Sequence, residues 1–264
     1  MTMKRTLSLT LAILLTLSML AGCGGKTPET TAPVNTPETV EPVETTAPAA
    51  PETTAPAVPE TTEPTVPETT EPVLEERALT LGVVEGNTYT NAYAGFGCNL
   101  DAGWTILPAD QIQELPALVK DAVDGTTMGE AMKDVQQFTD MMAENAEQLT
   151  NMNILFQKLG VDERLMYKIL DEEAVVDAAL SQKDAMIEAY TAMGLNVSSI
   201  EKVTVTFLGE EHFAMKTVAE IQGLTCYMLQ MFRHDLGEYM VTMTLTSYLE
   251  DNTDSMLDLF FAVE

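Results

Sequence analysis

The prolines of this chain are confined almost entirely to one segment. Of the 13 prolines in the 264-residue sequence, 11 lie between Pro28 and Pro72, where an octad that begins Pro-Glu-Thr-Thr runs three times over residues 51–74. Such a tract has little apolar surface to bury, so it cannot offset the entropy that ordering removes. We therefore expect residues 23–77 to form a disordered linker, biased towards extended polyproline II structure, and residues 78–264 to form one folded domain.

Four segments near the C-terminus alternate apolar and polar residues with the period of a β-strand. The breaks between them are short and contain Gly209, Gly223 and Gly237. Strands joined by such short turns pair as hairpins, and consecutive hairpins form an antiparallel meander. Shorter strands are expected within residues 88–99 and at 104–107, and the residues 101–103, Asp-Ala-Gly, are a turn signal before the second of these. The four strands of the expected meander are residues 202–208, 212–222, 224–234 and 238–248.

Helical spacing is clearest at residues 171–193. Three acidic residues open this segment, where they favour the positive end of a helix dipole, and Gly194 is typical of a C-terminal cap. A second helix is expected at residues 110–123, interrupted at Pro116, and a third from Asp251 or Asn252 through Val263. The sequence thus predicts an α+β domain in which helices flank an antiparallel β-sheet meander.

Two features of the domain leave alternatives open. The methionines of residues 128–149 fit a helical stripe, but residues 138–143 followed by 152–159 fit a hairpin equally well. Cys98 and Cys226 are an even pair in the domain, and either a disulfide or two buried free thiols is consistent with them.

Residues 1–22 have the organisation of a secretory leader. Basic residues precede an apolar run over residues 7–20, which is shorter than the roughly 20 residues that span a bilayer. The run ends in Leu20-Ala21-Gly22-Cys23, which resembles the lipobox of bacterial lipoprotein signal peptides. The resemblance implies that the leader is removed and that Cys23 becomes a lipidated N-terminus, carrying acyl chains such as palmitate, on the extracytoplasmic face of the cell membrane. An ordinary secretory leader cut near Ala21 is the alternative.

The segment from Tyr89 to Tyr93 and the segment from Phe96 to Trp104, taken with this element order, resemble the PsbP/Mog1-like domains found in many clostridial-type surface lipoproteins. The resemblance covers most of residues 86–264. It implies an antiparallel sheet flanked by helices, in a family whose members serve as assembly or binding factors. Its motif is a Tyr/Gly/Trp hairpin and turn rather than a reactive site, and a fold does not by itself imply a function.

The charge of the chain restricts its partners. It carries 41 acidic and 13 basic residues, for a net charge of −28 at pH 7. Nucleic-acid binding needs clustered Lys and Arg to replace phosphate counterions, and anionic lipid repels an acidic surface. We therefore expect no nucleic-acid partner, and we expect attachment to the membrane only through the lipid on Cys23.

Motifs that carry chemistry are absent from the sequence. It contains no nucleophile elbow, phosphate-binding loop, zinc-protease motif or CxxC pair. The carboxylate pairs at 172–173 and 210–211 are expected to be solvated. We therefore expect no catalytic residue, no cofactor and no metal ligand. The alternative is an envelope hydrolase or metal-dependent enzyme that uses His212, His234 and nearby carboxylates, if adjacent strands bring the two histidines together.

Two groups of side chains are candidates for binding. Tyr89, Tyr93 and Trp104 are candidates for an aromatic ligand platform, although a hairpin packed over a sheet edge explains them equally well. The methionines of the expected strands are interpreted as core rather than as an adaptable groove. The function that we expect is a non-catalytic binding or assembly module of the cell envelope, with an envelope protein or a small ligand as its partner.

Overall fold

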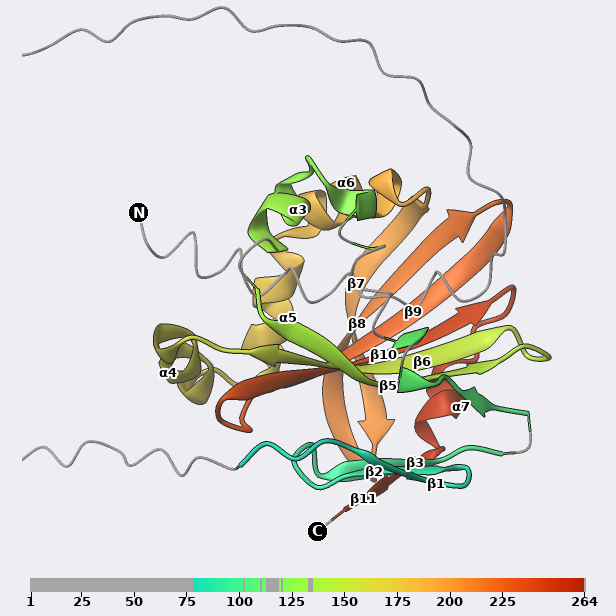
Figure 1. Ribbon diagram of the computed structural model, residues 1–264. Helices are drawn as coiled ribbons and strands as arrows, with labels where there is room; N and C mark the ends of the chain where they lie inside the picture. Colours follow the sequence, from blue (N-terminus) through green and yellow to red (C-terminus); the bar gives the residue numbers. More distant parts are fainter. Residues whose placement is uncertain are drawn as a thin grey trace, which may run out of the picture. The chain divides into compact units, whose positions relative to one another are not determined.

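The computed structural model describes residues 78–263, except residues 102, 110, 113–118, 120 and 133–134. The expected leader, Cys23 and the linker lie outside the described residues. The described part combines two antiparallel β-sheets with helices, as Figure 1 shows. The α+β class that the sequence predicts is therefore confirmed.

The larger sheet contains the predicted meander. Its strand order is β4-β5-β6-β10-β9-β8-β7, and all neighbouring strands are antiparallel. The four strands of the predicted meander are β7 to β10, which come last along the chain among the strands of this sheet. The first of them begins at Asn196 rather than at Lys202. The bounds are β4 Thr105–Ile106, β5 Gln137–Asn145, β6 Thr150–Lys158, β7 Asn196–Phe207, β8 Glu210–Ile221, β9 Leu224–Arg233 and β10 Tyr239–Tyr248.

The segment that was open between helix and hairpin contains both. Its first residues belong to a short helix, α3, Thr127–Met132, and the chain then forms the hairpin β5–β6. Strand β6 also pairs with β10, so this hairpin extends the meander across its other edge. Strand β5 has no regular alternation in solvent exposure, which is why periodicity alone could not distinguish this segment from a helix.

The smaller sheet was not anticipated. Its order is β1-β2-β3-β11, with strands at Val83–Glu85, Thr88–Asn91, Phe96–Asn99 and Phe260–Ala262. The expected final helix is therefore wrong beyond its first turns, because α7 ends at Leu257 (Thr253–Leu257) and the chain pairs with β3. The ring of Phe260 lies 5.7 Å from that of Phe96 and 5.6 Å from that of Phe207. Burial of this ring and pairing with the sheet edge outweigh the helical spacing of the segment.

The expected helix at residues 171–193 is two helices, α5 (Glu172–Leu180) and α6 (Lys183–Ala192). Asp171 caps α5 by accepting a hydrogen bond from the Ala174 N–H at 2.8 Å. At the break, the Ser181 hydroxyl donates to the Ala178 carbonyl, the kind of local bond that competes with a helix. A further helix, α4 (Val161–Ile169), was not predicted. In the expected helix at 110–123, the described residues 111–112, 119 and 121–123 are helical, and Pro116 lies outside the described residues.

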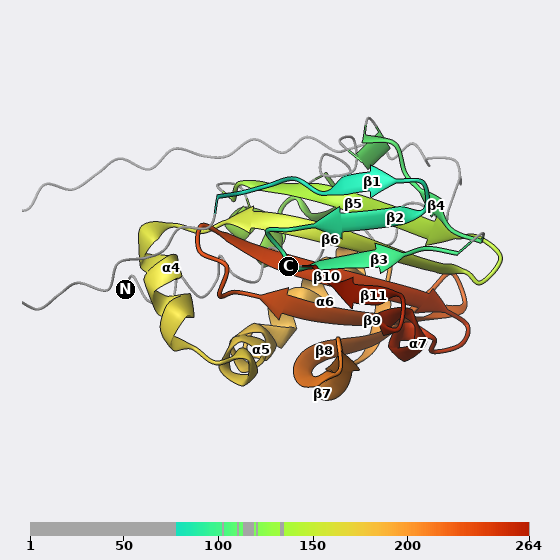
Figure 2. The same ribbon diagram turned by 90° about the horizontal axis from the view of Figure 1, so that it is seen from below.

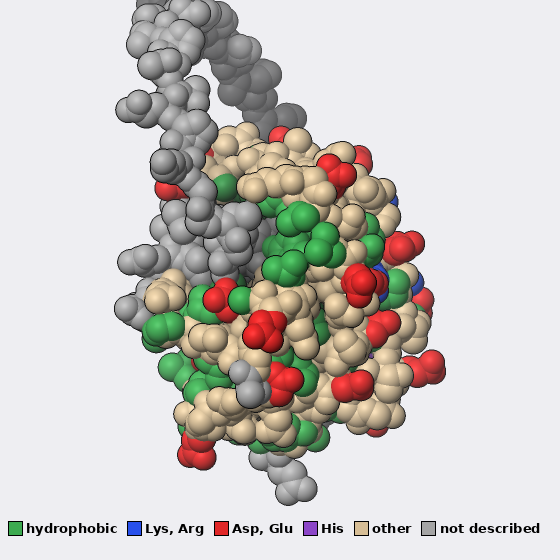
Figure 3. Space-filling view, turned by 90° about the vertical axis from the view of Figure 1, so that its right-hand side faces the viewer, with side chains coloured by type: hydrophobic (Ala, Val, Ile, Leu, Met, Phe, Trp, Pro, Cys, Tyr) green, Lys and Arg blue, Asp and Glu red, His purple; other side chains and the backbone are tan. Residues whose placement is uncertain are grey.

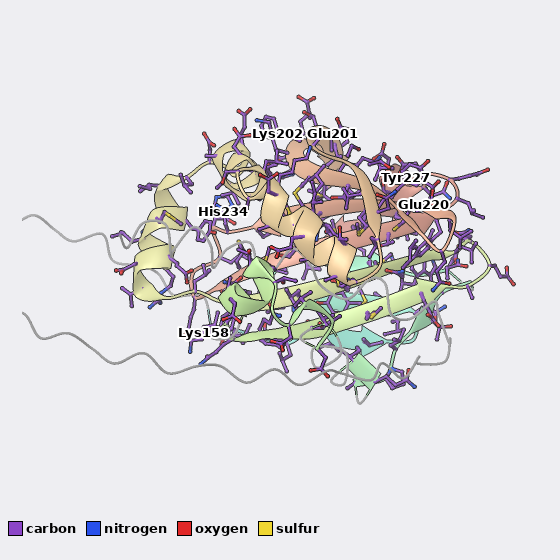
Figure 4. All side chains as sticks on the ribbon, turned by 90° about the horizontal axis from the view of Figure 1, so that it is seen from above. Lys158, Glu201, Lys202, Glu220, Tyr227 and His234 are labelled. Carbon is purple, nitrogen blue, oxygen red and sulfur yellow. The ribbon has the colours of Figure 1, made fainter. Side chains whose placement is uncertain are left out.

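The two faces of the large sheet carry separate cores. The smaller sheet packs on one face (Figure 2), and α5 and α6 pack on the other, over β7, β8 and β9 (Figure 4). The strand methionines are buried within these cores, as expected; they are Met215, Met228, Met231, Met240 and Met243.

The two cysteines of the domain are buried free thiols, so the disulfide alternative is not what the structure contains. Cys98 belongs to the core under the smaller sheet, whereas Cys226 belongs to the core under the helices. The large sheet therefore separates them. Burial raises the pKa of each thiol to about 12, which keeps both protonated and unreactive at neutral pH.

Candidate functional site

The three aromatic residues of the expected platform are all buried in one hydrophobic core, so they do not form an exposed platform. Tyr89 and Tyr93 are fully buried between the sheets, so their rings are not accessible from the surface. The Tyr93 hydroxyl accepts a hydrogen bond from the Tyr239 N–H at 2.9 Å, and this bond ties the β2–β3 turn to β10. Both tyrosines therefore hold the two sheets together, whereas Trp104 belongs to the same core and also lines an open cleft.

Tyr89 belongs to a polar junction that the sequence did not reveal. One carboxylate oxygen of Asp140 accepts hydrogen bonds from the Tyr89 hydroxyl at 2.6 Å, from the Asn91 side-chain amide at 2.8 Å and from the Gly82 N–H at 2.8 Å. Asp140 stands at the point where the β5–β6 register shifts, and a β-bulge of this kind re-aims a side chain. Burial and the adjacent carboxylate raise the pKa of Tyr89, so its hydroxyl remains a donor. We call these four residues the Asp140 junction; the available signal was an aspartate in the interior of β5, whose other charged residue, Glu144, lies near the end of the strand.

Trp104 lines an open cleft at one end of the large sheet. The cleft has a volume of about 570 Å³, within the range of ligand sites in proteins. Three turns surround it: the β3–β4 turn, the β5–β6 turn and the turn that links β10 to α7. We call it the Trp104 cleft, and its lining residues are Asp101, Trp104, Glu147, Gln148, Leu149, Tyr248, Leu249, Glu250, Asn252, Ser255, Met256 and Leu259. This end of the molecule is at the right in Figure 1 and faces the viewer in Figure 3, where apolar side chains lie beside several carboxylates.

Short polar residues shape two of the three turns. Asp101 accepts a hydrogen bond from the Gly103 N–H at 2.9 Å, which forms the turn before Trp104. A side chain at Gly103 would have a Cβ only 2.7 Å from the Asn145 amide, so the turn packs closely on the end of β5. Asn145 in turn accepts hydrogen bonds from the N–H groups of Glu147 and Gln148. The sequence signal of Asp101 to Gly103 thus marks one wall of the cleft.

Two leucines at the cleft adopt a backbone conformation that bulky residues rarely take. Leu149 has φ 53° and Leu249 has φ 70°, and their side chains are 42% and 54% exposed. The Glu250 N–H bonds to the Tyr248 carbonyl across Leu249 at 2.9 Å, which makes a strained three-residue turn. A hydrogen bond from the Tyr248 N–H to the Leu149 carbonyl joins the two turns. The fold therefore holds two leucines in this conformation beside each other, with their apolar groups in solvent; Leu208 and Gln222 adopt it too, in hairpin turns outside the cleft lining.

The lining of the cleft carries negative charge. Asp101, Glu147 and Glu250 are exposed, and the lining contains no Lys, Arg or His. The nearby Asp251 is bound to Lys216 and accepts a hydrogen bond from the Thr253 hydroxyl at 2.7 Å, so it anchors the turn. Burial alone would raise the pKa of Asp251, but its bonds to Lys216 and Thr253 hold that pKa below the ordinary value. The cleft is therefore an apolar surface bordered by carboxylates.

The histidines of the alternative enzyme hypothesis both flank the α4–α5 junction, but they have separate partners. His212 Nδ1 lies 3.0 Å from a carboxylate oxygen of Glu172, and His234 Nε2 lies 3.0 Å from the Leu170 carbonyl. Figure 4 shows His234 near the helices.

The two carboxylate pairs differ in their surroundings. Glu172 also accepts a hydrogen bond from the Phe213 N–H, so the expectation that Glu172 is solvated is wrong. Its exposed neighbour Glu173 forms an ion pair with Lys202. Glu210 and Glu211 are exposed, as expected. Within the described residues, no three His, Cys, Asp or Glu side chains are grouped so that they could hold a metal ion.

Comparison of the chain with known protein families and with curated proteins gives no match. In the part of the chain that the structure describes, no helix has the length and hydropathy that crossing a bilayer requires.

Proposed function

We propose that this protein is a lipid-anchored extracytoplasmic lipoprotein whose folded domain is a non-catalytic binding module, and that the Trp104 cleft is its ligand site. The observation that carries the proposal is the composition of the cleft. It brings an indole, two exposed leucines and three carboxylates together, and no Ser-His, Cys-His or metal-binding group lies among its lining residues. Such a surface is suited to recognition.

The anchoring part of the proposal rests on the sequence. Leu20 to Cys23 resembles a lipobox, and a net charge of −28 leaves the lipid on Cys23 as the means of attachment. The Pro-rich residues 23–77 then act as a spacer that holds the domain away from the membrane. We further propose that the domain is PsbP/Mog1-like, because it combines the Tyr/Gly/Trp segment at residues 89–104 with an antiparallel sheet and flanking helices.

Metabolic labelling with a palmitate analogue tests the anchor. In a bacterial host, the full chain should be labelled and should fractionate with membranes, and Cys23→Ser should abolish both. Cys98→Ala is the control, because it removes a buried thiol from the domain and should leave labelling unchanged. Labelling that survives Cys23→Ser contradicts the anchor.

The sole tryptophan of the chain gives a direct test of the ligand site. Because Trp104 lines the cleft, a ligand that binds there changes its fluorescence. We expect a saturable change with at least one class among peptidoglycan fragments, oligosaccharides, acidic peptides and basic peptides. Leu149→Ser should weaken that response, whereas Leu165→Ser, which alters an exposed leucine on α4, should not. No saturable change with any class contradicts the proposed function.

A further inference from the structure

We infer that the ligand of the Trp104 cleft is a cationic, amphipathic peptide segment in which Lys or Arg side chains stand beside bulky apolar ones. This inference rests on the proposed function, since it names the ligand class of the same site. It follows from three properties of the cleft: its unbalanced charge, its exposed apolar surface and its construction from three turns.

The charge of the cleft requires a cation. Asp101, Glu147 and Glu250 stand on its lining, and none of them forms an ion pair with a described Lys, Arg or His. The one lysine bound to the adjoining turn, Lys216, is already paired with Asp251. A ligand that brings its own ammonium or guanidinium groups therefore supplies the missing charge, and the net charge of −28 steers it towards the domain.

The apolar surface requires more than charge. Leu149 and Leu249 are about half exposed, and Trp104 and Met256 lie beneath them with little exposure. A bulky apolar side chain that covers these leucines removes their surface from water, which is the main favourable term in association. A strongly hydrated polycation without apolar groups leaves this surface uncovered.

The shape of the cleft favours a peptide over an isolated amine or a membrane. A volume of about 570 Å³ accommodates a few side chains, and the carboxylates come from three separate turns, so they face a ligand from several sides. An anionic lipid surface would be repelled by the same carboxylates. A short extended peptide that alternates basic and apolar side chains presents both chemistries at the required spacing.

The experiment titrates the full chain, anchored in neutral phosphatidylcholine vesicles, with four probes while Trp104 fluorescence is recorded. The probes are an acetylated and amidated octapeptide of alternating Lys and Leu, its Glu/Leu and Lys/Ser counterparts, and spermidine. Of the four probes, we expect only the Lys/Leu peptide to show saturable binding. Its affinity should fall as added salt screens the carboxylates.

Two matched pairs of variants test whether the peptide is bound by the carboxylates of the cleft or by the net charge of the protein. Glu147→Gln with Glu250→Gln should weaken Lys/Leu binding by about tenfold, the combined effect of two exposed charge pairs. Asp184→Asn with Glu201→Gln changes the net charge equally at exposed positions on α6 and β7, and should weaken binding less than about twofold. Equal weakening by both pairs overturns the inference, because only the overall field would then act.

The remaining outcomes separate this inference from the proposed function. Spermidine or the Lys/Ser peptide binding as tightly as the Lys/Leu peptide overturns the amphipathic ligand class. A response only to the Glu/Leu peptide, or only to an oligosaccharide or peptidoglycan fragment, also overturns it while leaving the cleft as a ligand site. Silence of Trp104 with every class contradicts the proposed function and the inference together.

Discussion

The Asp140 junction and the Trp104 cleft use similar residues in opposite ways. In the junction, a carboxylate accepts three hydrogen bonds and the aromatic ring beside it is fully buried. In the cleft, three carboxylates are exposed, and the indole forms part of an open wall. The aromatic residues of both regions come from the same stretch of sequence, residues 89–104. An aromatic–acid pair is therefore structural where the carboxylate is enclosed by donors of the fold, and it is available to a ligand where the carboxylates are exposed and form no ion pair with a described residue.

The largest expected effect separates the two regions by stability. Asp140→Ala leaves the buried Tyr89 hydroxyl and the Gly82 N–H without their acceptor, and it should lower the free energy of unfolding by about 3 kcal/mol. Urea denaturation measures this change. Asp184→Ala is the control, and it should change stability by less than about 0.5 kcal/mol because Asp184 is exposed on α6. A loss for Asp140→Ala as small as that of the control would mean that the junction does not hold the sheets.

The second prediction concerns the cleft, where a substitution should stabilise the fold instead of destabilising it. Asn tolerates a positive φ better than Leu does, so Leu149→Asn should raise the free energy of unfolding by about 1 kcal/mol. The same change removes apolar surface and should weaken Lys/Leu peptide binding several-fold. Gln222→Asn is the control, because it places the preferred Asn-Gly pair in the β8–β9 turn, outside the cleft lining. A loss of stability in Leu149→Asn would show that the Leu149 side chain packs within the fold and is not a surface available to a ligand.

A smaller effect is expected where the cleft is anchored. Because the pKa of Asp251 is lower in the folded protein than in the unfolded chain, its carboxylate stabilises the fold at neutral pH. This contribution is lost as the pH falls below about 4 and the group is protonated in the fold. Asp251→Asn should therefore lower stability by about 0.5 to 1 kcal/mol at pH 7 and leave it nearly unchanged at low pH. Denaturation at both pH values tests this, and an equal loss at the two would rule out the charge as the cause.

The smallest effect is expected for the two buried thiols, which should not react in the folded protein. In the Cys23→Ser variant, Cys98 and Cys226 should not react with a thiol reagent at neutral pH, because burial raises the pKa of both thiols to about 12. Both should react in urea. Labelling of either thiol in the folded protein, followed by mass spectrometry, would show that its core opens.

Local signals were sufficient for a part of the fold. Period-two alternation broken by Gly209, Gly223 and Gly237 predicted the meander, and Asp171 marked the start of a helix. The turn at residues 101–103 was predicted as well, and it now forms a wall of the cleft. These predictions succeeded because each depends on residues close together in the chain, whose backbone preferences act without distant partners.

Other features depend on partners that are far apart in the sequence. Phe260 lies on a strand because Phe96 and Phe207 bury its ring, and Asp140 is placed by donors about 50 to 60 residues away. Which of Tyr89, Tyr93 and Trp104 borders the cleft likewise depends on what covers each ring in their common core. The sequence alone determined that a Pro-rich tract adjoins a domain with an antiparallel meander, because composition and local periodicity are properties of neighbouring residues. Only the tertiary structure decided which aromatic residue and which carboxylates face an open cleft, because burial depends on what packs above them.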